Sequence, residues 1–328
     1  MTASNLTSAQ AALHQLKTYI NTQIIGQDVL VERLLIALLA DGHLLVEGAP
    51  GLAKTRAVNV LSQGLEADFH RVQFTPDLLP ADLTGTEIYR PQQGLFEFQK
   101  GPLFHNLILA DEINRAPAKV QAALLEAMAE RQITVGKATY PLPSLFMVMA
   151  TQNPIEQEGT YPLPEAQLDR FLLHVKVDYP NAVHEQSILH LARAEARGTL
   201  QTEKSQLQKV SQQTLFSARD EVLDIYMAET LERYLLEIVL ATRTPAAYGQ
   251  DLAKWLEYGA SPRASIALDR CARAKAWLDQ RDFVEPGDIQ TMAFDVLRHR
   301  LILSYEAEAE GVSSDDVIKQ LIARIAVP

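Results

Sequence analysis

Short apolar runs alternate with amphipathic stretches through the first half of the chain. Each run is bounded by turn or polar residues, a pattern typical of buried strands. The runs lie at 43–48, 69–74, 103–112, 144–152 and 170–178. Between them, residues 54–65 and 116–130 carry apolar side chains at helical spacing. Strands that alternate with helices predict an α/β fold with a mostly parallel, five-stranded sheet that is flanked by helices.

Two stretches interrupt this rhythm with alternating apolar and polar residues on either side of a turn. Residues 84–104 and 131–143 therefore predict two β-hairpins inserted into the α/β unit. From about residue 182 onward, apolar residues recur at three- and four-residue spacing, which predicts an all-helical domain. We place the α/β unit at residues 1–190 and the helical domain at residues 191–328.

The composition is ordinary for a globular protein of about two domains. Of the 328 residues, 47% are apolar and 22% are charged. The net charge of −11 argues against general binding to nucleic acid or to an anionic membrane. Cys271 is the single cysteine, which excludes an intramolecular disulfide. Since the start lacks a signal-peptide pattern and no apolar run could cross a bilayer, we expect a cytoplasmic protein without a membrane span.

The stretch GAPGLAKT, from Gly48 to Thr55, lies between the first predicted strand and the helix that follows it. It differs from the phosphate-loop pattern G-x-x-x-x-G-K-[ST] at Ala53, where the pattern has glycine. A strand, a tight loop and a helix N-terminus aim backbone N–H groups and the helix dipole at one point, a geometry that binds phosphate. Lys54 would contact the terminal phosphates, and the Thr55 hydroxyl would bind Mg²⁺. Taken alone, the stretch fits a packing turn equally well.

Whether this loop can bind phosphate depends on the backbone conformation of Ala53. Its backbone must take a conformation that an L-residue tolerates, or it must carry a modest strain. Under that condition, the residues expected to bind the nucleotide are Gly48, Ala49, Pro50, Gly51, Leu52, Ala53, Lys54, Thr55 and Arg56.

Two neighbouring carboxylates, Asp111 and Glu112, end a predicted strand. Neighbouring residues of a strand point to opposite sides, so the two acids can take separate roles. Asp111 would bind Mg²⁺ and Glu112 would polarise the attacking water; with the loop, this is nearly all that phosphoryl transfer needs. Asn153, at the end of the next strand, would orient that water. Taken one by one, these residues also fit a solvated strand end and a simple Asn-Pro turn.

Two arginines stand where contacts with a nucleotide are expected. Arg170 directly precedes the last predicted strand and would reach the nucleotide of a neighbouring subunit as an arginine finger, which stabilises transition-state charge. Arg263 follows the helix-start residues Ser261 and Pro262, and would contact the nucleotide from the helical domain. For both arginines, a solvated surface position is the simpler alternative.

With these motifs in this order, the chain resembles the AAA+ ATPases and, within them, the MoxR family. GAPGLAKT is similar to the phosphate loop of that family, in which alanine before the lysine is normal. ILADEINRAP, ATQNP, LPEAQLDRF and GASPRA resemble its magnesium, first-sensor, finger and second-sensor motifs. The two hairpins look like those of the helix-2-insert branch. The resemblance also implies that Ile25 and Gly26, in IIGQD, lie near the adenine.

The resemblance implies a P-loop AAA+ core with a C-terminal helical lid, ATP and Mg²⁺ as cofactors, and a homo-hexameric ring with sites between neighbours. It implies a chaperone that uses ATP hydrolysis to remodel or mature protein complexes, with a separate partner that carries a von Willebrand factor A domain. Two other functions stay open, because fold analogy does not identify the client. One is a motor on DNA, weakly supported by Lys100 and Lys137 of the hairpins. The other is a non-catalytic, nucleotide-dependent assembly scaffold.

Overall fold

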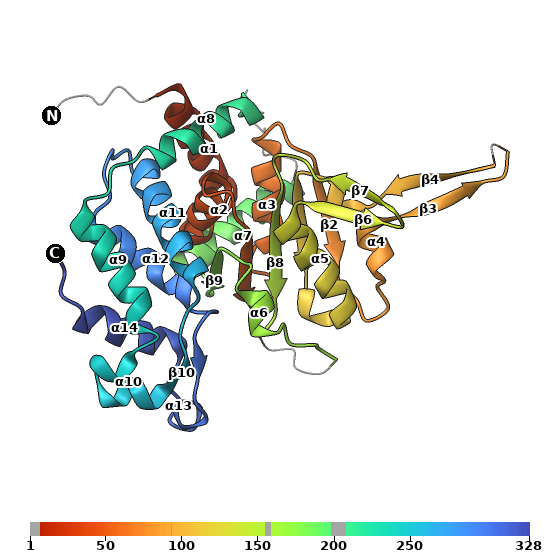
Figure 1. Ribbon diagram of the computed structural model, residues 1–328. Coiled ribbons are helices and arrows are strands. Elements are labelled where there is room, and N and C mark those ends of the chain that lie inside the picture. Colours follow the sequence, from red (N-terminus) through yellow and green to blue (C-terminus); the bar gives the residue numbers. More distant parts are fainter. Residues whose placement is uncertain (1–6, 93, 155–158, 198–207) are drawn as a thin grey trace.

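The computed structural model describes residues 7–92, 94–154, 159–197 and 208–328. At its centre is a five-stranded sheet in the order β2-β5-β8-β1-β9, in which all neighbouring strands run parallel (Figure 1). The predicted α/β fold is thereby confirmed. The strands are β1 (Leu44–Gly48), β2 (Phe69–Gln73), β5 (Leu107–Asp111), β8 (Met147–Gln152) and β9 (Leu173–Val177). The helices in this part of the chain are α1 (Ser8–Gln23), α2 (Asp28–Leu39), α3 (Lys54–Gln63), α4 (Pro80–Thr84), α5 (Ala118–Glu130), α6 (Glu165–Leu168) and α7 (Ala182–Ala196).

Alternate residues of the strands are buried in two separate hydrophobic clusters, one on each face of the sheet. Leu44 and Val46 of β1 belong to the cluster that contains α1, α2 and α3, whereas Leu45 belongs to the cluster that contains α5. Both faces of the sheet are therefore covered by helices, as in other parallel sheets. The period of two along each strand decides which side chain meets which helix.

Two antiparallel hairpins interrupt the α/β order. β3 (Gly85–Arg90) pairs with β4 (Leu95–Lys100), and β6 (Gln132–Val135) pairs with β7 (Ala138–Pro141). The first hairpin projects from the body of the molecule (Figure 1). The ring of Phe98 on β4 stacks on that of Tyr140 on β7, with the centroids 4.2 Å apart. The two hairpins therefore pack together as one projecting unit.

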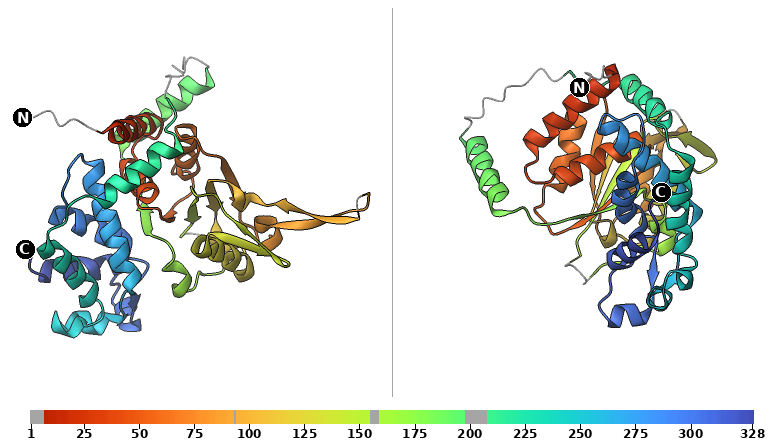
Figure 2. Two further views of the ribbon diagram at one scale, coloured as in Figure 1. Left: turned by 45° about the horizontal axis from the view of Figure 1, so that its top comes forward. Right: turned by 90° about the vertical axis from the view of Figure 1, so that its left-hand side faces the viewer.

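The C-terminal part of the chain is a helical domain at the other end of the molecule from the long hairpin (Figure 2). Its helices are α8 (Gln212–Leu223), α9 (Glu229–Ala241), α10 (Gln250–Trp255), α11 (Pro262–Leu278), α12 (Pro286–Leu297), α13 (Tyr305–Ala309) and α14 (Ser314–Arg324). A short antiparallel pair, β10 (Leu256–Tyr258) with β11 (Ile302–Leu303), adds a feature that the helical spacing did not predict. The boundary predicted at 190/191 falls inside α7. None of the described helices is both long enough and apolar enough to cross a bilayer.

The helical domain and the sheet share one continuous core. The hydrophobic cluster around α2 extends without a break into α8, α11 and α12. Arg33 of α2 and Asp295 of α12 cross this interface as a buried ion pair, with 2.6 Å between Arg33 Nε and the carboxylate. Separating the two would leave a buried charge without its partner, which is strongly unfavourable. The pair therefore stabilises the relative position of the two parts that the structure shows.

Candidate active site

The loop after β1 has the strand–loop–helix geometry that its sequence predicts. β1 ends at Gly48 and α3 begins at Lys54, so the loop lies at a helix N-terminus. Gly48 leaves no room for a side chain, since a Cβ atom would lie 2.7 Å from the carbonyl oxygen of Val177 on β9. Gly51 has a φ of +84°, which glycine adopts without strain. Both glycines are therefore required by the path of the loop.

Ala53 takes the left-handed conformation directly before the lysine, with φ 57° and ψ 15°. Glycine adopts this conformation freely, whereas an L-residue there is strained by about 1 kcal/mol. The sequence left open whether the backbone of Ala53 is relaxed or modestly strained, and in the structure it is modestly strained.

We expect Ala53→Gly to raise the free energy of unfolding by about 0.5–1 kcal/mol, because relief of the strain outweighs the added entropy of the unfolded chain. Urea denaturation of the parent and the variant measures the difference. Ala57→Gly is the control, since Ala57 lies inside α3 and glycine there should destabilise by about 1 kcal/mol or more. If Ala53→Gly also destabilises, the left-handed backbone costs nothing at this position.

Lys54 is folded back over the loop. Its Nζ donates a hydrogen bond to the carbonyl oxygen of Gly48 at 2.6 Å and one to that of Gln152, at the end of β8, at 3.4 Å. Partial burial lowers the pKa of the ammonium group, and the carboxylates of Asp111 and Glu112 oppose that shift. The lysine is thus a cation between the loop and two strand ends, where a phosphate could replace its carbonyl contacts.

Asp111 is the last residue of β5 and lies beside that lysine. One of its carboxylate oxygens accepts a hydrogen bond from the Thr151 hydroxyl at 2.6 Å. The other accepts two from the guanidinium of Arg71, at 2.7 and 3.1 Å. Neighbours on β8 and β2 therefore hold the carboxylate from both sides.

Glu112 follows with a left-handed backbone, φ 56° and ψ 52°, which is unusual for a long side chain and must be held by its surroundings. Its backbone N–H donates to the Thr151 hydroxyl at 2.9 Å. Its carboxylate accepts hydrogen bonds from Gln73 of β2 at 2.8 Å and from Arg115 at 2.9 Å. The acid is therefore restrained at the same strand end as Asp111.

Asn153 is buried directly after β8, next to the carbonyl group of Gln152 that Lys54 contacts. Since β5, β8 and β1 are parallel neighbours, their carboxyl ends meet at one edge of the sheet. The structure thus brings together five of the predicted site residues, namely Lys54, Thr55, Asp111, Glu112 and Asn153.

An apolar hollow lies beside the phosphate loop. Ile25 lines it together with loop residues 51–53, and Ile188 and Leu191 of α7 close it from another side. The structure thus places Ile25 beside the phosphate loop, and its contact with an adenine stays a prediction. Gly26 does not line the hollow: it has a φ of +75°, and a Cβ atom there would lie 2.8 Å from the ring of His184. Close packing is the role that the structure gives to this glycine.

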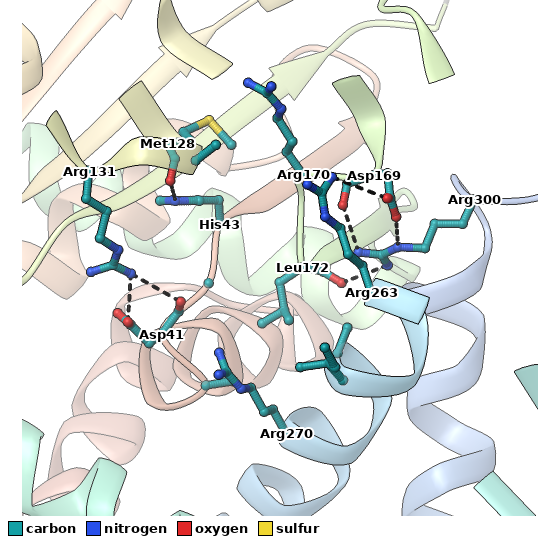
Figure 3. A pocket seen from close by; sticks show the side chains of 15 residues that line it. Asp41, His43, Met128, Arg131, Asp169, Arg170, Leu172, Arg263, Arg270 and Arg300 are labelled. Atoms are coloured by element: carbon teal, nitrogen blue, oxygen red, sulfur yellow. Dashed lines mark hydrogen bonds and ion pairs between the residues drawn. The ribbon is translucent and has the colours of Figure 1, made fainter. Parts of the chain in front are cut away.

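Arg170 and Arg263 do not join this group. Because β1 and β9 are parallel, the residues that precede them lie at the edge of the sheet opposite to the phosphate loop. Arg170 lies there with Gly42 and His43, in a pocket that Arg263 lines from α11 (Figure 3). The structure therefore brings the two arginines together. The expected contact of Arg263 with a nucleotide is not made within one chain in this conformation.

The pocket around these arginines is cationic. Its lining includes five arginines and two aspartates: Arg131, Arg170, Arg263, Arg270, Arg300, Asp41 and Asp169. Arg131 pairs with Asp41 and Arg300 with Asp169. Burial lowers the pKa of His43, which also lines the pocket, to about 4, so this ring is neutral at neutral pH. The excess of positive charge favours an anion, although the whole chain carries −11.

Comparison with known proteins identifies the family. Residues 43–173 match the family described as ATPase family associated with various cellular activities (AAA), and residues 252–321 match the AAA lid domain. Chaperone MoxR1 of Mycobacterium tuberculosis is 46% identical over 306 residues, which cover 93% of this chain and 79% of the relative. The chain belongs to the MoxR family of AAA+ ATPases.

Two further relatives agree with a MoxR-family assignment. Protein MoxR of Paracoccus denitrificans is 32% identical over 339 residues, with 99% of each chain covered. The crystal structure of a candidate ATPase from Cytophaga hutchinsonii is 47% identical and superimposes with a TM-score of 0.88 over 98% of this chain and 96% of that chain. The α/β core with a helical lid is therefore also the fold of a solved relative.

Membership of the MoxR family implies nucleotide binding, typically with Mg²⁺, and the donors around the loop fit that pair. In the ranges that the structure describes, no three His, Cys, Asp or Glu side chains cluster as a metal site. Mg²⁺ usually takes one or two protein ligands and completes its shell with water and substrate phosphates. Thr55, in the first turn of α3, and Asp111, at the end of β5, offer a hydroxyl and a carboxylate for that purpose.

Several contacts of this MoxR-family site were not predicted from the sequence. Thr151 could have been singled out from the sequence, since its hydroxyl group directly follows an apolar run. Arg270 could also have been singled out, because it follows Arg263 by seven residues, about two helical turns, and so shares its face of α11. No sequence pattern points to Arg71 and Gln73, because their contacts depend on β2 being the neighbour of β5.

Proposed function

We propose that this protein is a Mg²⁺-dependent ATPase. The observation that carries the proposal is the convergence of Lys54, Asp111 and Glu112 at one edge of the sheet. Phosphoryl transfer needs a cation at the phosphates, an acid at the metal and an acid at the water, all in one place. Phosphate release from ATP that stops when a chelator removes Mg²⁺ tests the proposal. A chain that binds ATP without any turnover would instead be a nucleotide-dependent scaffold.

Each residue of the site has a separate task. The N–H groups of the loop and the N-terminus of α3 hold the phosphates, and Lys54 exchanges its carbonyl contacts for the terminal phosphate. Thr55 and Asp111 would hold the Mg²⁺, which would neutralise charge on the phosphates. Glu112 accepts the proton of the attacking water as general base, and Asn153 orients that water.

We further propose that a neighbouring subunit completes the site. Arg170 and Arg263 lie at the far edge of the sheet, so they are placed for the nucleotide of another chain and not for their own. A contact between the arginine pocket of one chain and the phosphate loop of the next is heterologous, and it closes into a ring when the rotation between subunits allows. The family resemblance favours a ring of six. Guanidinium groups brought to the phosphates in this way stabilise transition-state charge.

The client that we propose is a protein, which the projecting hairpins contact. Tyr89, Leu95 and Phe96, at the outer end of the first hairpin, are 51%, 63% and 68% exposed. An exposed apolar surface of this kind marks a site of protein interaction. An action on DNA would depend on Lys100 and Lys137. Lys100 lies at the base of the first hairpin with its ammonium 5.1 Å from the ring centre of Phe104, whereas Lys137 is exposed at the turn of the second hairpin. A protein client therefore fits the first hairpin better than DNA.

The relative from Mycobacterium tuberculosis is named a chaperone. We accordingly propose that the client is a protein complex that is remodelled or matured at the cost of ATP. A separate protein with a von Willebrand factor A domain is the adaptor that the family resemblance favours.

Replacing Leu95 and Phe96 by serine should lower capture of client proteins about tenfold, since a few apolar residues usually carry most of the affinity of an interface. The measurement is co-purification from the native source with the parent and the variant. The matched control replaces Leu236 and Leu240 of α9 by serine, because these leucines are also exposed but lie in the helical domain. Equal capture of client proteins by both variants would show that the hairpin does not contribute to client binding. Salt-dependent capture of DNA by the parent would favour the other client.

A further inference from the structure

Asp169 directly precedes Arg170 and contacts the helical domain through both of its carboxylate oxygens. One oxygen accepts a hydrogen bond from Arg300 Nε at 2.8 Å. The other accepts one from the Ser261 hydroxyl at 2.9 Å and lies 3.5 Å from Arg263 Nη1. All three partners belong to the helical domain, whereas Asp169 belongs to the segment between α6 and β9. Figure 3 shows Asp169 with two of these partners, Arg263 and Arg300. A single carboxylate thus joins the finger segment to the start of α11 and to the turn that follows α12.

Arg300 extends this contact to the backbone. Its guanidinium donates to the carbonyl oxygen of Phe171 at 2.6 Å and to those of Leu172 and Asp169 at 3.3 Å. The Arg300 side chain is buried, and the carboxylate of Asp169 that pairs with it is partly buried. An interface that served packing alone could be apolar, since burying a guanidinium with a carboxylate costs desolvation energy and often adds no stability. The polar contact therefore points to a role in setting how the finger segment lies relative to the helical domain.

The guanidinium of Arg170 has no hydrogen bond or ion pair within the described part of the chain. Its backbone N–H donates to the carbonyl oxygen of Gln167 at 3.2 Å, and its side chain points away from Asp169 (Figure 3). Arg263 is 60% exposed and is held by Asp169 over 3.5 Å. The direction of both arginines is therefore set by the segments that carry them, and Asp169 is where those segments meet.

We propose that Asp169 is a positioning residue that ties the finger segment to the helical domain of its own subunit, so that Arg170 and Arg263 are presented to the neighbouring nucleotide as one unit. The inference rests on the proposed ring. A displacement of the helical domain then moves both arginines relative to the next site. The effect of Asp169 lies in the turnover of the neighbour and not in that of its own subunit.

A mixture of two disabled subunits separates this role from a structural one. Donor subunits carry Lys54→Ala, which removes the phosphate contact but keeps the arginines. Receiver subunits carry Arg170→Ala, which keeps the phosphate loop but removes the finger. In a mixed ring, ATP is hydrolysed at receiver sites that face a donor. Asp169→Asn keeps the size of the side chain and removes its charge, and it is placed first in the donors and then in the receivers.

We expect Asp169→Asn in the donors to lower phosphate release about tenfold to a hundredfold, because small misplacements of transition-state contacts have effects of that size. The loss should be confined to the donors, since the receivers have no finger to position. Equal losses in both kinds of subunit would overturn the inference. If the mixture without Asp169→Asn releases no phosphate, the neighbouring-subunit contact of the proposed function is refuted, and the inference falls with it.

A second variant tests the inference if Asp169→Asn fails to fold, since that substitution leaves Arg300 buried without its counter-charge. Ser261 caps α11, and glycine serves nearly as well at that position. Ser261→Gly therefore removes mainly the hydroxyl bond to Asp169. We expect it to lower phosphate release about two- to tenfold in the donors, the usual weight of one hydrogen bond, and not in the receivers. The same factor in both kinds of subunit would count against the inference.

Discussion

Glu112→Gln should lower the rate of ATP hydrolysis by about a thousandfold, the usual contribution of a general base, and leave ATP binding intact. Glutamine has the size of glutamate and can still meet Gln73 and Arg115, so the strand end keeps its geometry. It cannot accept the proton of the attacking water. Single-turnover phosphate release measures the rate, and titration with a fluorescent ATP analogue measures the affinity.

The matched control for this substitution is Glu126→Gln, since Glu126 is an exposed carboxylate on α5. The control should keep the rate of the parent. Undiminished turnover in Glu112→Gln would contradict the role of this acid. A joint loss of turnover and binding would mean that Glu112 holds the nucleotide or its metal and does not act on the water.

Arg170→Ala should lower turnover about 10³-fold or more, because finger arginines contribute 10³–10⁵ in rate. The expected cause is the loss of a positive charge from the site of the neighbouring subunit. Mixing Arg170→Ala with Lys54→Ala should therefore restore turnover, although each variant alone is inactive. In a random, equal mixture at most about a quarter of the sites pair an intact loop with an intact finger, so recovery is partial and peaks at equal amounts.

Phosphate release measured across mixing ratios checks this prediction. Arg233→Ala is the control, because Arg233 is an exposed arginine of α9 that pairs with Glu229 far from the pocket, and its loss should not lower turnover. Rings that form normally but show no recovery at any ratio would sink the assignment of Arg170 to the neighbouring site.

The central strands β1, β5 and β8 could be predicted because they bury side chains on both faces, as Leu44, Leu45 and Val46 of β1 do in two different clusters. The order of the strands could not, since it depends on how each crossover packs. That order places β2 beside β5 and so brings Gln73 to Glu112, a contact between residues far apart in the sequence. The β10–β11 pair was missed because two or three residues are too few to show a period.

The motifs predicted the phosphate loop and the acids because each is local: a turn before a helix, and carboxylates at the end of a strand. The side on which Arg263 lies depends on how α11 packs against α2, which no local pattern encodes. The same holds for Asp169, whose partners Ser261 and Arg300 lie just before α11 and just after α12 of the other domain. What the sequence shows least is therefore the relation between the two domains.

The phosphate loop and the arginine pocket lie at opposite edges of one sheet, so a proposed ring of these subunits has a sense of rotation. In such a ring, the arginines of each subunit would reach the nucleotide of the neighbour on one side. Its own nucleotide would be reached by the arginines of the neighbour on the other side. An open row of subunits would leave the loop at one end and the arginines at the other without partners. In a closed ring, every contact between neighbouring subunits would therefore point the same way around, and that polarity is already present in a single chain.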